Sequence, residues 1–173
     1  MFKSCRCLHI SAADAPDLSH VKCMDRMFEG CRFLNSDIEH WDVSNITSML
    51  GIFSCAFHFN KPLNHWDVSN VQNMAQMFAF AASFNQPLNH WNVSNVKSME
   101  HMFSSDTAFN QPLNQWDVSH VEDMWGMFEM TESFKQKLDN WDASSVDSGE
   151  CSWLSENMKI VNGKVVVSPV SPS

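Results

Sequence analysis

The sequence is poor in glycine, in basic residues and in long apolar runs, and each shortage excludes a class of function. Its 173 residues include only five glycines, too few for the glycine-rich loops that cradle nucleotide phosphates. Eleven Lys and Arg residues stand against 20 Asp and Glu residues, which gives a formal net charge of −9. Such a chain repels phosphate backbones and anionic lipid surfaces. We therefore expect neither a nucleic-acid partner nor a membrane-surface partner.

No run of about 18 apolar residues occurs in the sequence, so we expect no membrane insertion. The first residues also lack the apolar core of a signal peptide. Six cysteines are irregularly spaced, and the cluster Cys5, Cys7, Cys23 and Cys31 matches no common zinc pattern. We expect reduced thiols and neither a metal nor another cofactor, while compartment and oligomeric state remain open.

What the sequence does contain is an internal repeat with a period of 25 residues. Five tryptophans mark it: Trp41, Trp66, Trp91, Trp116 and Trp141. Around them the pattern reads Phe-Asn-Gln-Pro-Leu-Asn-x-Trp-Asp-Val-Ser-Asn-Val-x-x-Met-x-x-Met-Phe, with the cleanest copies beginning at Phe59, Phe84 and Phe109. A fixed period of this size is typical of repeat architectures, in which each unit buries its apolar side chains against its neighbours.

Each repeat predicts a short strand followed by a helix. The strand is expected around Leu88, Trp91 and Val93. Helical spacing i, i+3, i+6 and i+7 follows at Val96, Met99, Met102 and Phe103. Ser-x-x-Gln and Ser-x-x-Glu pairs such as Ser69 with Gln72 have the form of a helix capping box. The predicted fold class is therefore α/β, a leucine-rich-repeat-like solenoid of 25-residue strand-helix turns with capping ends.

The departures from the repeat predict the domain boundaries. Residues 1–16 are expected to form an N-terminal cap, and residues 17–157 the solenoid of about six turns. Residues 158–167 contain two short, mostly apolar runs on either side of Asn162-Gly163, which indicates a hairpin that covers the open edge of the strands. Residues 168–173 contain two prolines and are predicted to be a disordered tail.

The repeat unit closely resembles that of the BspA-type leucine-rich-repeat family of bacterial and mycoplasma surface proteins, over about residues 17–157. The resemblance implies an α/β solenoid and, for many members, adhesion at a cell surface. This chain shows no signal peptide, lipobox or transmembrane segment, so a surface location is not predicted. The family offers no catalytic residues, and nothing in the sequence resembles a nucleophile elbow or a phosphate loop. We expect no enzymatic activity.

Two polar rows deserve weighing as ligand sites. The first contains Asp42, Asp67, Asn92, Asp117 and Asp142. Because Asn92 keeps the hydrogen-bonding capacity but removes the charge, a turn or capping role is favoured over cation binding. The second row contains His40, His65 and His90 and continues as Gln115 and Asn140. A solvent-facing polar row is favoured there over a metal site.

Partner recognition is expected where the repeats differ, since their framework is fixed. The candidate partner-binding residues are Leu50, Phe57, Phe80, Trp125 and Met130. Aromatic residues and Met are favoured in interface centres, although the same side chains would also suit packing over a neighbouring turn. The predicted function is a non-enzymatic module for protein-protein interaction or adhesion with a protein partner. The alternative is a structural subunit built permanently into a larger assembly or virus-like particle.

Overall fold

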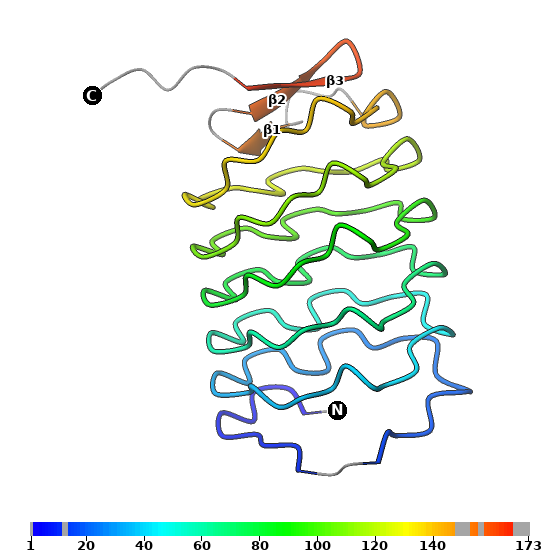
Figure 1. Cartoon of the computed structure of the whole chain (residues 1–173), viewed down its shortest axis with the longest axis vertical. Helices are drawn as coiled ribbons and strands as arrows, with labels where there is room; N and C mark the ends of the chain where they lie inside the picture. Colours follow the sequence, from blue (N-terminus) through cyan, green and yellow to red (C-terminus); the bar gives the residue numbers. More distant parts are fainter. Residues whose placement is uncertain (1, 12–13, 148–152, 156–157, 168–173) are drawn as a thin grey trace.

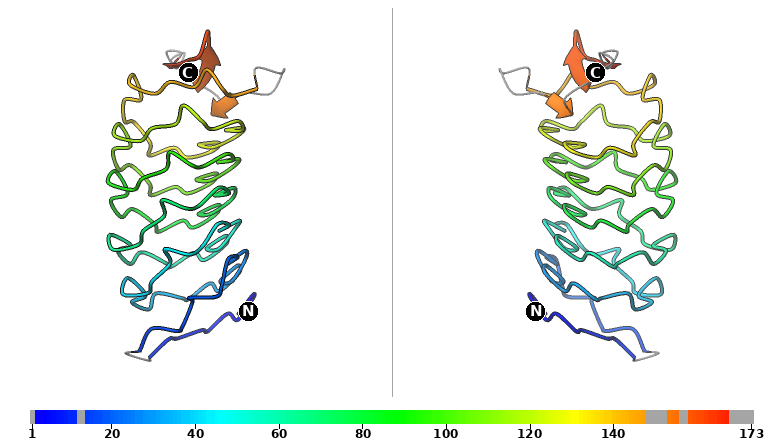
Figure 2. Two further views of the ribbon diagram at one scale, coloured as in Figure 1. Left: turned by 90° about the vertical axis from the view of Figure 1, so that its right-hand side faces the viewer. Right: turned by 90° about the vertical axis from the view of Figure 1, so that its left-hand side faces the viewer.

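The chain winds into a stack of coils, each displaced from the next by 25 residues. The computed structural model describes residues 2–11, 14–147, 153–155 and 158–167. Isolated parallel bridges join Cys23 to Ser48 and continue at the same interval through Asn73 and Ser98 to Asp123. Figure 1 shows the coils lying one above another, and the side views in Figure 2 show the same stacking.

The described residues contain no helix, so the predicted leucine-rich-repeat-like solenoid of strand-helix turns is wrong. The segment expected to be helical instead forms two consecutive β-turns in each coil. In the coil that contains residues 74–81, the Met77 N–H donates to the Met74 carbonyl at 3.2 Å, and the Ala81 N–H donates to the Phe78 carbonyl at 2.9 Å. These bonds close four-residue turns, whereas a helix would bond residues four apart along the chain.

Each of these turns has a positive φ at its third residue, as a type II turn requires. The ten residues are Arg26, Gly30, Gly51, Cys55, Gln76, Phe80, His101, Ser105, Gly126 and Met130. The N–H groups of the first eight point along the stack. Those of Gln76 and Phe80 donate to carbonyls of the next coil at 2.7 and 2.8 Å. The backbone is therefore satisfied between coils, which gives a helix no advantage.

The helical spacing misled because two successive four-residue turns produce the same apolar pattern. The first and last residue of each turn face the same side, so positions 74, 77, 78 and 81 all point inward and all are fully buried. The expected capping box is absent as well. The Ser69 N–H donates to Asp67 Oδ1 at 3.0 Å, within its own loop.

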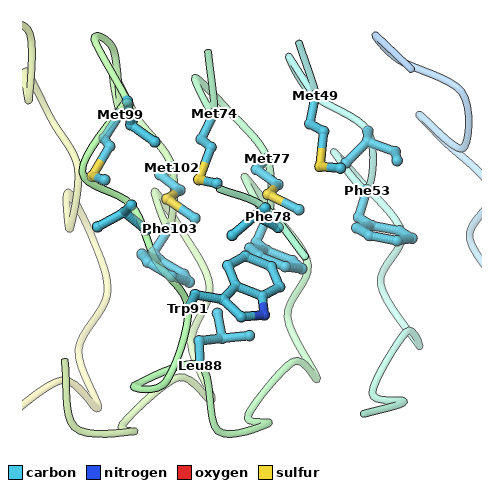
Figure 3. Close-up of a cluster of buried hydrophobic side chains, with 14 of the residues drawn as sticks. Met49, Phe53, Met74, Met77, Phe78, Leu88, Trp91, Met99, Met102 and Phe103 are labelled. Carbon is cyan, nitrogen blue, oxygen red and sulfur yellow. The ribbon is translucent and has the colours of Figure 1, made fainter. Parts of the chain in front are cut away.

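The core consists of side chains stacked in columns from coil to coil. Figure 3 shows the Met and Phe residues of three successive coils lying beside their equivalents. One column contains Phe28, Phe53, Phe78, Phe103 and Phe128, with ring centroids 5.6–5.7 Å apart. A second Phe column packs against the first with centroids about 4 Å apart, as for Phe78 and Phe84 at 4.0 Å. Every coil therefore buries its aromatics only through its neighbours.

Two polar ladders fix the register between coils. The buried indole N–H of Trp66 donates to the Ile38 carbonyl at 3.0 Å, and the tryptophans of the next three coils repeat this bond at 2.9–3.2 Å. In the loops, Asn60 Oδ1 accepts the Asn85 N–H, and Asn85 Oδ1 accepts the Asn110 N–H, both at 3.0 Å. The asparagine ladder forms because Asn recurs at the same position of successive repeats.

Three short strands lie at the C-terminal end of the stack: β1 (Trp153–Ser155), β2 (Met158–Val161) and β3 (Lys164–Val167). They pair antiparallel in the order β1-β2-β3. The hairpin expected at Asn162-Gly163 is present between β2 and β3, and both turn residues have positive φ, 51° and 71°. The tail predicted over 168–173 lies outside the described residues.

Candidate protein-binding face

The two β-turns of every coil form one continuous outer surface, which we call the turn face. It contains the two central residues of each turn, at positions 25–26, 29–30, 50–51, 54–55, 75–76, 79–80, 100–101, 104–105, 125–126 and 129–130. Because the first and last residues of each turn point into the core, the central residues lie on the opposite side, where the larger side chains are exposed or half-buried and small ones such as Ala75, Ala79 and Ser104 are buried. Equivalent positions stack into columns that run along the molecule.

Four of the five candidate partner-binding residues lie on the turn face. Leu50 and Trp125 share one column, three coils apart, and Phe80 and Met130 share another, two coils apart. Leu50 is half-buried. The exposed fractions of Phe80, Trp125 and Met130 are 49%, 46% and 64%, so these three large apolar side chains are open to solvent.

The fifth candidate, Phe57, lies beyond the second turn of its coil and is half-buried. The Arg32 guanidinium carbon sits 5.2 Å from the Phe57 ring centroid, a cation–π contact between neighbouring coils. The sequence analysis missed Phe33, which is 56% exposed and meets the His58 ring edge-on at 5.0 Å. Its equivalents are His58, Ser83, Ala108 and Ser133. The same comparison of repeats would have found it.

Trp125 is held in place by a cluster with His101, Gly126 and Glu129. The His101 and Trp125 rings meet edge-on with centroids 4.8 Å apart, and His101 Nδ1 lies 3.3 Å from Glu129 Oε2. The imidazole lies against Gly126, where any side chain would collide with it. Trp125 is therefore a positioned side chain with an open surface.

The surroundings of Trp125 are acidic. Asp123 Oδ1 accepts the backbone N–H of Trp125 at 2.9 Å. Glu100 occupies the equivalent position in the preceding coil. The backbone N–H of the next residue, His101, donates to the Trp125 carbonyl at 2.8 Å, so Glu100 lies in the coil directly beside Trp125. Together with Glu129, these carboxylates match the net negative charge of the chain. The electrostatic field around the exposed indole is therefore negative.

The aspartate row on the loop surface shapes its own turns. Asp42 Oδ1 accepts both the hydroxyl and the N–H of Ser44, at 2.6 and 3.0 Å. These bonds, the hydroxyl first, lower the pKa of Asp42. Asn92 makes the same pair of bonds to Ser94 at 2.8 and 3.2 Å. The turn role favoured from the sequence is thus present in both the charged and the neutral copies.

The histidine row does not converge on a shared point. His65 Nδ1 lies 3.3 Å from Glu39 Oε1, whereas His90 Nε2 lies 2.9 Å from the Asn64 carbonyl oxygen. Within the part of the chain that the structure describes, no three His, Cys, Asp or Glu side chains gather as a metal site would require. That part of the chain also contains no helix long and apolar enough to cross a membrane.

The geometry defines a class of protein, a stack of 25-residue coils joined by hydrogen bonds between equivalent residues. The chain belongs to the family described as "Mycoplasma protein of unknown function, DUF285", whose model matches residues 1–100 and 76–159. Neither the curated proteins nor the solved structures contain a match.

Proposed function

We propose that this protein is a non-enzymatic protein-binding module whose turn face, around Phe80, Trp125 and Met130, docks on a protein partner. The observation that carries the proposal is the choice of residues at a strained backbone position. Phe80 and Met130 have φ values of 59° and 55°. A left-handed conformation costs roughly 1–2 kcal/mol for a residue other than Gly, Asn or Asp, and bulky residues rarely adopt it.

Neither folding nor turn formation explains these two residues. The equivalent positions hold Gly30, Cys55 and Ser105, so the turn forms without a large side chain. Phe80 and Met130 are also too exposed to contribute much to the core. Strained residues of this kind persist at functional sites, and exposed aromatics and Met are favoured in the centres of interfaces.

The resemblance to BspA-type surface proteins supports an adhesive role for this binding. Each coil of the stack adds the same outer positions, so a small number of substitutions alters the face without altering the framework. The acidic residues beside Trp125 favour a partner with basic groups at the contact. We propose adhesion to such a protein as the biological use of the turn face.

The test compares the wild-type protein with the double variant Phe80→Asn and Met130→Asn. Asn tolerates the left-handed conformation, so thermal unfolding should show a variant at least as stable as the wild type. Tagged proteins are then used to capture partners from the cells that make them, with quantitative mass spectrometry of the eluates. A partner enriched by the wild type and lost from the double variant supports the proposal.

Phe33→Ser provides the matched control, because it removes an exposed aromatic side chain that lies off the turn face. It should leave the partner bound. Equal recovery of the partner by the wild type and the double variant would contradict the proposed face. Light scattering of the wild-type eluate tests the second candidate function. A large particle of fixed stoichiometry would indicate a structural subunit in place of a binding module.

A further inference from the structure

Residues 2–10 form an additional layer at the N-terminal end of the stack. The sequence Phe2-Lys-Ser-Cys-Arg repeats as Phe28-Glu-Gly-Cys-Arg, 26 residues further on. The Phe2 N–H donates to the Met27 carbonyl at 3.0 Å, and the two Phe rings stack with centroids 6.0 Å apart. The layer begins the Phe column of the core and imitates a neighbouring coil.

Hydrogen bonds on both sides of Cys5 fix its register against Cys31. The Ser4 N–H donates to the Glu29 carbonyl at 2.6 Å, and the Phe33 N–H donates to the Arg6 carbonyl at 3.1 Å. Ser4 and Gly30, which precede the two cysteines, both have positive φ, 60° and 71°. Cys5 and Cys31 therefore occupy equivalent positions in adjacent layers.

The Cys31 thiol lies next to Cys5. The Cys31 thiol is buried and donates to the Phe2 carbonyl at 3.0 Å. Burial raises the pKa of the Cys31 thiol; the backbone amide of Cys5 opposes this rise, and the Cys5 thiol adds to it. Hydrogen-bonded neighbouring chains lie about 4.8 Å apart, within the Cα separation of roughly 4.4–6.8 Å that disulfides span.

We propose that Cys5 and Cys31 are a thiol-disulfide modification site, at which a low-molecular-weight disulfide links the N-terminal layer covalently to the first full coil. This inference is independent of the proposed function. The exposed Cys5, as thiolate, attacks the small disulfide, forms a mixed disulfide and releases one thiolate. The Cys31 thiol then attacks the Cys5 sulfur and passes its proton to the second small thiolate, which leaves as a thiol. The protein pair is oxidised, and the small disulfide is reduced to two thiols.

The other described cysteines, Cys7, Cys23 and Cys55, lack a cysteine at the equivalent position. Cys7 corresponds to Phe33, Cys23 corresponds to Ser48, and Cys55 corresponds to Gly30 and Phe80. Cys7 and Cys23 are exposed, which makes them accessible to the same oxidant. They therefore serve as controls, because their thiols are accessible but have no cysteine at the equivalent position of a neighbouring layer.

The experiment treats the folded full-length protein with glutathione disulfide, blocks the remaining thiols with iodoacetamide, and maps disulfides by mass spectrometry of unreduced peptides. The wild type and the variants Cys7→Ser and Cys23→Ser should yield a Cys5–Cys31 cross-link, lighter by the mass of two hydrogen atoms. Cys5→Ser should not. This variant changes an exposed residue, so it should remain folded.

Oxidation should also stabilise the protein against denaturant, because the bond closes a loop in the unfolded chain. The unfolding equilibrium constant of the wild type should fall by roughly a hundredfold or more, and that of Cys5→Ser should not change. Recovery of only mixed disulfides with glutathione would overturn the proposal. A dominant link between other cysteines, such as Cys5 with Cys7, would overturn it equally.

Discussion

Asp106 is a buried carboxyl group that should make the stability of the protein fall as the pH rises. Its side chain is fully buried, Oδ1 accepts the Ala108 N–H at 3.3 Å, and Oδ2 has no hydrogen-bond partner. Burial raises the pKa of Asp106 to about 8, although the amides of Ala108 and Phe109 oppose the rise. The equivalent positions in the coils on either side hold Ala81 and Thr131, neither of which carries a charge.

The raised pKa sets both the direction and the size of the effect. The unfolded chain loses the Asp106 proton near pH 3.8, whereas the folded protein keeps it until about pH 8. The stability cost of Asp106 is therefore absent below about pH 4 and grows until the pH passes the folded pKa. Each pH unit in this window costs about 1.4 kcal/mol, which amounts to about 4 kcal/mol at pH 7.

Asp106→Ala should remove this cost, because Ala already occupies the same position at Ala56 and Ala81. The variant loses one hydrogen bond to the Ala108 N–H, worth about 1 kcal/mol. We expect a net stabilisation of about 2–4 kcal/mol at pH 7 and none at pH 4. Asp106→Asn, of the same shape, should also lose the pH dependence.

Urea unfolding of the wild type and both variants, at intervals between pH 4 and pH 9, measures the difference. The wild-type free energy of unfolding should fall relative to Asp106→Ala by the slope of one proton, and the difference should level off above pH 8. Parallel pH profiles for the wild type and Asp106→Ala would refute the reasoning, because they would show that Asp106 ionises equally in both states.

Two further comparisons test the ladders and the turns. Trp66→Phe removes the indole hydrogen bond to the Ile38 carbonyl, whereas the buried Trp41 indole N–H has no partner among the described residues. In urea unfolding, Trp66→Phe should therefore cost about 1–2 kcal/mol more than Trp41→Phe. Equal costs would argue against the ladder. Gly126→Ala must displace the imidazole that lies against it, so it should lower the melting temperature more than Gly51→Ala, which has the same positive φ and no such contact; equal losses would show that only φ matters.

The repeat period and the inward-facing residues were predictable because they are properties of the sequence itself. A period of 25 places Met and Phe at equivalent positions, and a coil of this length cannot bury them alone. The asparagine ladder follows from the same identity of positions. The repetition of Phe2 to Arg6 at Phe28 to Arg32 was also visible, and a search at an offset of 26 residues would have revealed the extra layer.

The local conformation was not predictable from the pattern. Spacings of three and four residues suit both a helix and two successive type II turns, since both place the same side chains on one side. The choice depends on where the backbone N–H groups bond, and in this protein those of Gln76 and Phe80 bond to the next coil. A helix prediction made from the pattern of one repeat does not include the hydrogen bonds that the neighbouring coil supplies.

The candidate binding residues show the same division. The sequence identified Phe80, Trp125 and Met130 as departures from the repeat, and this required only a comparison of its copies. Their common location on the turn face, and the location of Phe57 away from it, depended on the turn geometry. Sequence alone thus determined which residues repeat and which vary. Tertiary structure decided which way each one points, because hydrogen bonds between coils set the backbone conformation.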